Sequence, residues 1–377
     1  MKRLIAVMTL IASLALLLSA CGGGGGGAGA AAGGGSSSEG GVISYSRFAY
    51  VANYANDNVS AYGVDTTTGQ LKYIGKIGTG SGPVSVTVDP SGKYAYVANW
   101  YSSSVSQYRI NADGSLTVIA TAVAAGSYPR SVTVDPSGKY AYVANWTGPE
   151  VTDVGSVSQY SINANGSLSS MATPTVAAGV APFSVTVDPF GKYAYVANGN
   201  SNDISQYNIN ADGSLSSMTT PTVAAGAGPV SVAVDPSGKY AYVANELSND
   251  ISQYNINGDG SLTTITTAVA AGTGPSSVTV DPSGKYAYVA NLNSSNVSQY
   301  SIDANNGSLL PMAPPTAAAE TKPQFITVDP SGKYAYVANW FSNSVSQYSI
   351  SADGSLLSMA TPTVAASSGP FSITLTP

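Results

Sequence analysis

The sequence contains no histidine and a single cysteine, Cys21. A Ser/His/Asp or Cys/His nucleophile system is therefore excluded, and so is a disulfide within the chain. Charged residues make up only 9% of the sequence, with 14 Lys and Arg against 20 Asp and Glu. Because a nucleic-acid partner requires clustered cations to neutralise its phosphates, these few scattered cations argue against one.

Clusters of carboxylates are also missing. Loops rich in Asn and Asp, such as residues 56–58 and 200–203, each hold one carboxylate. A calcium ion takes about six to eight oxygen ligands, several of them from carboxylates. The sequence therefore predicts no metal site, and it contains no motif for a cofactor.

No apolar run is long enough to span a membrane. Lys2 and Arg3 precede the apolar run from Leu4 to Leu18, which is shorter than the ~20 residues that a spanning helix needs. The run ends in small residues, so residues 1–20 are predicted to be a signal peptide.

The residues that follow this run predict a lipid anchor. Leu18-Ser19-Ala20-Cys21 resembles a bacterial lipobox, and we expect Cys21 to be lipidated and bound to a membrane; a plain cleaved signal peptide is the alternative. Residues 21–44 are rich in Gly, Ala and Ser and are predicted to form a flexible tether. The absence of Asp after Cys21 favours the outer membrane, so the predicted location is the cell envelope.

The rest of the chain is a tandem repeat. FAYVAN begins at Phe48, and YAYVAN begins at intervals of 46 to 53 residues at Tyr94, Tyr140, Tyr193, Tyr240, Tyr286 and Tyr334. A period of this length, built from β-forming and turn residues, is typical of propeller blades rather than of a helical solenoid.

One repeat unit divides into four strands. In the copy at 83–126 we expect strands A to D at residues 83–89, 93–99, 104–110 and 115–123. Residues 90–92 (Pro-Ser-Gly) and 111–114 (Asn-Ala-Asp-Gly) are turn sequences that join A to B and C to D. Each unit is therefore predicted to form one four-stranded antiparallel blade.

The phase of the repeat predicts how the ring closes. The first unit begins on strand B at Phe48, and the chain ends with an unpaired A strand at residues 371–377. If this last strand completes the first blade, no sheet edge is left open between the ends. We predict an all-β fold at 45–377, a seven-bladed propeller whose ring is closed by the C-terminal strand.

The units YAYVAN, VSQY and VDPSGK resemble the YVTN-type repeat of the lactonase-like seven-bladed β-propeller family. This family includes a 6-phosphogluconolactonase and a fungal muconate-lactonising enzyme, together with surface proteins of no assigned activity. The resemblance covers essentially all of 45–377, and it implies the fold more firmly than the chemistry, because one fold hosts many functions.

Differences between the copies point to one face of the ring. The B–C and D–A connections lie on the same face, and all three tryptophans fall directly after a B strand. Aromatic side chains bury a large area at low entropic cost, so we expect a ligand-binding rim there, although the rings could instead cap the blade ends. The candidate ligand-binding residues are Tyr54, Trp100, Tyr101, Tyr128, Arg130, Trp146, Phe183, Glu246, Lys322, Trp340 and Phe341.

The sequence supports two functions for this face. The resemblance implies catalysis by His, Arg and Glu, but this chain has no histidine, and only Arg130, Glu246 and Lys322 remain as weak catalytic candidates. The sequence therefore favours a non-catalytic, monomeric envelope lipoprotein that binds a protein, glycan or wall component. The alternative is a lactone hydrolase that acts in the cleft on this face.

Overall fold

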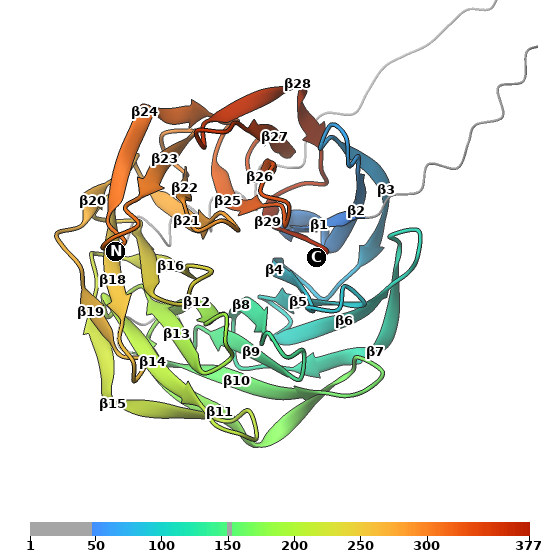
Figure 1. Ribbon diagram of the computed structural model, residues 1–377. Helices are drawn as coiled ribbons and strands as arrows, with labels where there is room; N and C mark the ends of the chain where they lie inside the picture. Colours follow the sequence, from blue (N-terminus) through green and yellow to red (C-terminus); the bar gives the residue numbers. More distant parts are fainter. Residues whose placement is uncertain (1–46, 149–152) are drawn as a thin grey trace, which may run out of the picture. The chain divides into compact units, whose positions relative to one another are not determined.

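The computed structural model describes residues 47–148 and 153–377, which form a ring of seven antiparallel sheets (Figure 1). The predicted signal peptide, lipidation site and tether lie outside the described residues. The single helix among the described residues is the short 3-10 helix η1 (Tyr54–Asn56). Nothing in that part of the chain forms a helix with the length and apolar character needed to cross a membrane.

Blade 1 combines the two ends of the described chain. From the axis outward it contains β29 (Pro370–Leu375), β1 (Phe48–Asn53), β2 (Asn58–Val64) and β3 (Leu71–Gly78). Antiparallel pairing places Ile373 opposite Val51 and Leu375 opposite Ala49. The predicted closure of the ring by the C-terminal strand is confirmed.

Blades 2 to 7 each run outward in chain order from an innermost strand A to an outermost strand D. Blades 2 to 4 are formed by β4 (Pro83–Val88), β5 (Tyr94–Asn99), β6 (Ser104–Ile110), β7 (Leu116–Ala124), β8 (Pro129–Val134), β9 (Tyr140–Asn145), β10 (Val154–Ile162), β11 (Leu168–Val180), β12 (Pro182–Val187), β13 (Tyr193–Asn198), β14 (Asp203–Ile209) and β15 (Leu215–Ala224). Blades 5 to 7 are formed by β16 (Pro229–Val234), β17 (Tyr240–Asn245), β18 (Asp250–Ile256), β19 (Leu262–Thr264), β20 (Val269–Ala270), β21 (Pro275–Val280), β22 (Tyr286–Asn291), β23 (Asn296–Ile302), β24 (Leu309–Ala318), β25 (Pro323–Val328), β26 (Tyr334–Asn339), β27 (Ser344–Ile350) and β28 (Leu356–Ala365). The strands of the unit at 83–126 match the predicted ones to within one residue.

The repeated Tyr and Gln side chains form hydrogen bonds between neighbouring blades. The Tyr96 hydroxyl donates to the Gly166 carbonyl at 2.7 Å, and the Leu168 amide donates to Gln107 Oε1 at 2.6 Å. Both hydrogen bonds are buried between blades 2 and 3, where unpaired polar groups would be costly. The YAYVAN and VSQY motifs therefore supply the polar contacts between blades as well as the strands.

The same two contacts join blade 7 to blade 1. The Tyr336 hydroxyl donates to the Gly69 carbonyl at 2.5 Å, and the Leu71 amide donates to Gln347 Oε1 at 2.6 Å. The seam where the two ends of the described chain meet is thus bonded like the five seams from blade 2 to blade 7. Of the two bonds, the seam between blades 1 and 2 keeps only the tyrosine bond, from Tyr50 to the Gly114 carbonyl, because Ala61 replaces the glutamine.

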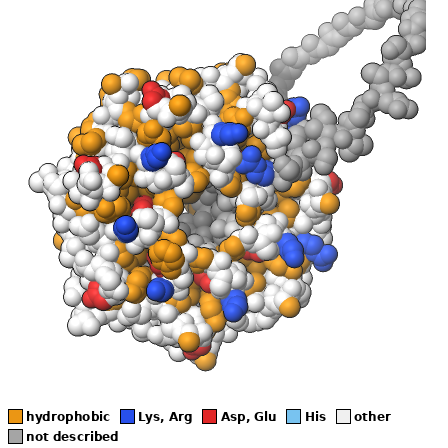
Figure 2. All heavy atoms as spheres, in the orientation of Figure 1, with side chains coloured by type: hydrophobic (Ala, Val, Ile, Leu, Met, Phe, Trp, Pro, Cys, Tyr) orange, Lys and Arg blue, Asp and Glu red, His pale blue; other side chains and the backbone are white. Residues whose placement is uncertain are grey.

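The A–B turns define the lower face of the ring. Asp89 is buried and accepts hydrogen bonds from the amides of Ser91, Lys93 and Tyr94, as expected for a turn aspartate. Among the described residues, however, no lysine of these turns forms an ion pair with its aspartate. A cation directly precedes every B strand, at Arg47, Lys93, Lys139, Lys192, Lys239, Lys285 and Lys333. Figure 2 shows Lys and Arg side chains spaced around the central hollow of the ring.

Arg47 differs from its six lysine counterparts because it is paired. Its guanidinium donates to Asp329 in the A–B turn of blade 7, and the Asp329 side chain is completely buried. This ion pair adds a further polar link between the first and last blades, beside the two hydrogen bonds. It also places Arg47 on the lower face, away from the candidate site.

Candidate functional site

A β-bulge at the start of each A strand aims one side chain toward the axis. Pro129 pairs with Asn145 and Ser131 with Ala144, so Arg130 is the extra, unpaired residue. A bulge of this kind bends the strand and redirects a side chain. The equivalent residues of the seven blades are Val84, Arg130, Phe183, Val230, Ser276, Gln324 and Phe371.

Contacts of Arg130 show that these side chains meet near the axis. Its Cζ atom lies 4.4 Å from the ring centroid of Phe183 and 5.4 Å from that of Phe371. Phe371 belongs to blade 1, which is separated from the blade of Arg130 by a whole blade. Arg130 is therefore the only charged member of this inner ring of seven, and it lies at the upper end of the axis.

Aromatic rings surround the Arg130 guanidinium. Its Cζ atom lies 4.7 Å from the Trp100 centroid, in the geometry of a cation–π contact. Trp100 lies 5.1 Å from both Tyr128 and Trp146, and Trp146 stacks on Phe183 at 6.1 Å. Side chains of blades 2, 3 and 4 thus form one continuous wall.

Two tyrosines extend this wall into blade 1. The Tyr54 ring lies 6.1 Å from Phe371 and 5.8 Å from Tyr101, and the two tyrosine hydroxyls are 2.8 Å apart. Tyr101 is 59% exposed, so the outer end of the wall faces solvent. We call this set the aromatic arc: Tyr54, Trp100, Tyr101, Tyr128, Trp146, Phe183 and Phe371.

Not all of the predicted rim belongs to the arc. Trp340 lies in blade 7, where its Nε1 atom would be 3.2 Å from a Cβ atom added to Gly369. Phe341 is 62% exposed and contacts no aromatic ring among the described residues. Trp100, in contrast, is only 6% exposed and packs beneath its neighbours. Trp100 therefore packs at the blade end, whereas Tyr101 and Phe341 are accessible, and ligand binding by the rim stays a prediction.

Phe371 was not among the predicted site residues. Its position in the closing strand hides its relation to Arg130 in the linear sequence. The signal that could have found it is the proline that starts every A strand. Aligning the seven copies on that proline brings Phe371 and Phe183 to the same position as Arg130.

Glu246 interacts electrostatically with both candidate cations, Arg130 and Lys322. Burial lowers the pKa of Arg130 to about 10, against the opposing effect of the Glu246 carboxylate, so the guanidinium stays charged at neutral pH. Burial also raises the pKa of Glu246, although the cations of Arg130 and Lys322 oppose this effect. Lys322 Nζ donates a hydrogen bond to Asn293 Oδ1 at 2.6 Å. We call Arg130, Glu246, Lys322 and the aromatic arc together the axial site.

Backbone strain marks two members of the axial site. The residue before each A-strand proline has a left-handed backbone, and four copies place glycine there. Tyr128 (φ 52°) and Lys322 (φ 62°) adopt the same conformation with full side chains. Such a conformation costs a non-glycine residue about 1 kcal/mol. Ala181 adopts the same conformation in blade 4 (φ 58°), so the strain belongs to the repeated D–A connection rather than to these two side chains.

The arrangement contains the elements needed for hydrolysis of an ester bond. A partly desolvated carboxylate with a raised pKa, such as that of Glu246, is a stronger base than an exposed one and is suited to act as a general base. A guanidinium without a carboxylate partner among the described residues is suited to stabilise an oxyanion. No three His, Cys, Asp or Glu side chains of the described residues are grouped so that they could hold a metal ion.

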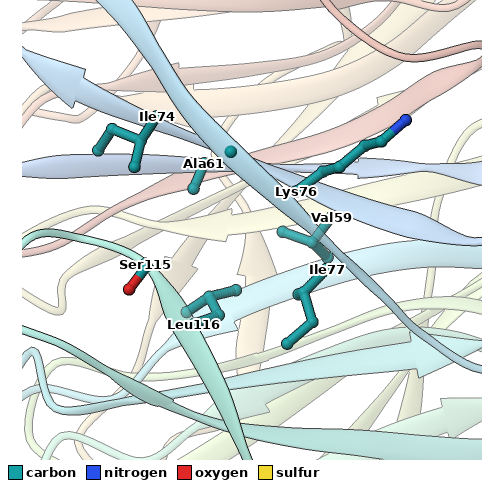
Figure 3. Close-up of a pocket in the computed structure, with 8 residues that line it drawn as sticks. Val59, Ala61, Ile74, Lys76, Ile77, Ser115 and Leu116 are labelled. Atoms are coloured by element: carbon teal, nitrogen blue, oxygen red, sulfur yellow. The ribbon is translucent and has the colours of Figure 1, made fainter.

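A separate pocket lies on the outer wall of the ring. It has a volume of about 130 Å³ and lies between β2, β3 and the start of β7 (Figure 3). Its walls are mainly the apolar side chains of Val59, Ile74, Ile77 and Leu116, and it includes no residue of the axial site. It exists partly because Gly75 contributes no side chain.

Filling this pocket is expected to stabilise the protein. A Cβ atom on Gly75 would meet nothing within 4 Å. Gly75→Ala should raise the free energy of unfolding by about 0.4–1 kcal/mol, mainly by restricting the unfolded chain. Gly69→Ala is the matched control, because its Cβ atom would lie 2.3 Å from the Tyr334 ring and its φ is +73°. Thermal unfolding should rise for the first variant and fall for the second; a fall for both would contradict the open space at Gly75.

Together, the closed ring and the axial site define a class of protein, a seven-bladed β-propeller with a cluster of aromatic and charged side chains at one end of its axis. Comparison with known families identifies the particular one. A family model described as Lactonase, 7-bladed beta-propeller, matches residues 46–154, 113–231 and 151–320, and a model described as LVIVD repeat matches residues 327–343. The chain belongs to the lactonase family of seven-bladed β-propellers.

Solved structures support the same fold. A putative 6-phosphogluconolactonase from Bacteroides fragilis is 22% identical, with a TM-score of 0.75 over 88% of this chain and 98% of that one. The periplasmic gluconolactonase of Pseudomonas aeruginosa is 19% identical, with a TM-score of 0.74 over 88% of this chain and 99% of that one. A sequence comparison with curated proteins gives no match.

Proposed function

We propose that this protein hydrolyses a lactone at the axial site. The observation that carries the proposal is the position of the Arg130 guanidinium, which lies within 5.4 Å of three aromatic rings at the upper end of the axis and interacts electrostatically with Glu246. Membership of the lactonase family supports this function over the non-catalytic binding protein that the sequence alone favours. The absence of histidine does not remove the possible base, because a carboxylate with a raised pKa can take that role.

In the proposed reaction, the oxygen of a water molecule attacks the lactone carbonyl carbon while the Glu246 carboxylate accepts a proton from that water. The Arg130 guanidinium donates hydrogen bonds to the oxyanion that forms. The ring C–O bond then breaks, and the proton held by Glu246 passes to the departing alkoxide. One water is consumed, and the product is a hydroxycarboxylic acid.

Arg130→Gln tests this assignment. Loss of the oxyanion partner should lower kcat about 10²- to 10³-fold. The variant should also shift the acid limb of the pH–rate profile to higher pH, because the Arg130 cation opposes the burial that raises the pKa of Glu246. The assay measures acid release from a panel of lactones, with spontaneous hydrolysis subtracted.

Arg109→Gln is the matched control, since Arg109 is an exposed arginine on β6, away from the axial site. It should retain wild-type kcat and an unshifted pH profile. If the wild-type protein hydrolyses a lactone and Arg130→Gln is as active as Arg109→Gln, Arg130 has no part in the reaction.

One observation favours a second function, the binding of a macromolecule. Tyr101, Leu247 and Phe341 occupy the same repeat position on the upper face, and each is more than half exposed. These side chains fit the protein or glycan partner expected from the sequence. The envelope location and the lipid anchor at Cys21 belong to the same proposal, as does a monomeric state. Binding of an envelope component without turnover of any lactone would favour this function over hydrolysis.

A further inference from the structure

The aromatic arc and the single cation beside it limit the kind of substrate. Arg130 has three aromatic rings within 5.4 Å of its Cζ atom, and no carboxylate of the described residues lies within ion-pair distance. The site therefore offers one place for one anionic group. In the proposed reaction that place is taken by the acyl oxygen of the lactone.

A phosphate group would need further cations. It carries close to two negative charges at neutral pH and is bound in proteins by several charged donors. Lys322 is the only other cation of the axial site, and its Nζ atom already donates to Asn293. Lys322 also interacts electrostatically with Glu246. A phosphate bound to Lys322 would therefore compete for that cation with the carboxylate that serves as base.

Sugar hydroxyls would find few partners in the aromatic arc, where the polar side-chain groups without a hydrogen bond among the described residues include the Tyr128 hydroxyl and the Trp146 N–H. The hydroxyls of Tyr54 and Tyr101 bond to each other, and the Ser276 hydroxyl bonds to the carbonyls of Ala290 and Pro323. The Trp146 indole N–H is buried without a partner among the described residues and is one free donor in the arc. Burying several hydroxyls against the arc would leave most of them unpaired, which is costly.

Apolar groups, in contrast, fit the arc well. Trp100, Tyr128, Trp146 and Phe183 form a continuous wall with centroid separations of 5.1 to 6.4 Å. Flat hydrocarbon groups stack favourably on such rings. Sites with an apolar wall and one or two well-placed polar groups are typical of small-molecule binding.

We infer that the axial site selects a neutral lactone with an apolar, ring-bearing body over a phosphorylated or polyhydroxylated sugar lactone. The acyl oxygen lies on Arg130, the apolar body stacks on Trp146 and Phe183, and the Trp146 N–H donates to a ring oxygen. This inference rests on the proposed function for the reaction, but the recognition itself is measurable without turnover.

Calorimetric titration with stable carboxylates that mimic the product tests the recognition. Phenylacetate should bind about tenfold or more tightly than gluconate or 6-phosphogluconate, and phenylacetamide, its neutral analogue, should bind weakly. Arg130→Gln should weaken phenylacetate binding about tenfold or more, whereas the control Arg109→Gln should not. Phe183→Leu should weaken phenylacetate binding by a smaller factor. Thermal unfolding verifies that each variant is folded. Equal or tighter binding of gluconate or 6-phosphogluconate would overturn the inference.

A parallel activity assay separates this inference from the proposed function. Arg130-dependent binding of phenylacetate without hydrolysis of any lactone would support the recognition and contradict the hydrolase. Hydrolysis with a preference for gluconolactone over aryl-substituted lactones would support the hydrolase and contradict the recognition.

Discussion

A chain that lacks β29 is expected to lose its cooperative unfolding transition. Deletion of residues 369–377 removes the innermost strand of blade 1 and exposes the inner edge of β1, which is buried in the intact ring. The cost should exceed about 5 kcal/mol, the lower end of the stability of whole domains. The prediction is checked by thermal unfolding followed by circular dichroism.

A point substitution tests the same closure without removing backbone. Ile373 is 1% exposed and lies in one buried cluster with Val51 of its own blade and Tyr336 of blade 7. Ile373→Ala should lower the free energy of unfolding by about 2–5 kcal/mol. Leu357→Ala on β28 is the control, because Leu357 is 53% exposed and its loss should change stability by less than about 0.5 kcal/mol. A deletion variant that melts cooperatively at the wild-type temperature would show that the ring does not depend on β29.

Glu246→Gln is expected to lower activity and to raise stability at neutral pH. Loss of the general base should reduce kcat about 10²- to 10⁴-fold. The stability change has the opposite sign because burial raises the pKa of Glu246 in the folded protein. As the pH rises, the unfolded chain releases this proton first, so the wild-type protein loses stability above the ordinary carboxyl range. Glutamine carries no charge and avoids this loss.

The pH dependence distinguishes this effect from a general change in packing. The difference in melting temperature between Glu246→Gln and wild type should vanish below the ordinary carboxyl range, where both states hold the proton. Glu320→Gln is the matched control, since Glu320 is exposed on the D–A connection of blade 6, and it should change neither activity nor stability. A stability difference that is the same at every pH would contradict the linkage to Glu246.

The fold could be predicted from the sequence because each repeat carries its own contacts. Tyr96 and Gln107 bond to the next blade through groups that recur in nearly every copy, so one unit explains the others. The position of Phe48 at the start of a B strand, with an A strand at the end of the chain, then determines the closure. These features are local and regular, so they can be recognised in the sequence alone.

The site could be predicted only in part, because its residues converge from different blades. The sequence indicates the face and most of the rings, but it does not show that Arg130 meets Phe371, which is 241 positions later in the chain. That contact depends on a bulge that turns both side chains toward the axis. The raised pKa of Glu246 likewise depends on burial in the assembled ring.

The pH–rate profile of lactone hydrolysis by the wild-type protein, measured beside Arg130→Gln and Glu246→Gln, tests the central claim most directly. We predict turnover above the spontaneous rate, with an acid limb above the ordinary range of a glutamate. That limb should move to higher pH in Arg130→Gln, and turnover should fall about 10²- to 10⁴-fold in Glu246→Gln. Turnover that is unchanged in Glu246→Gln, or no turnover of any lactone by the wild-type protein, would contradict catalysis at the axial site.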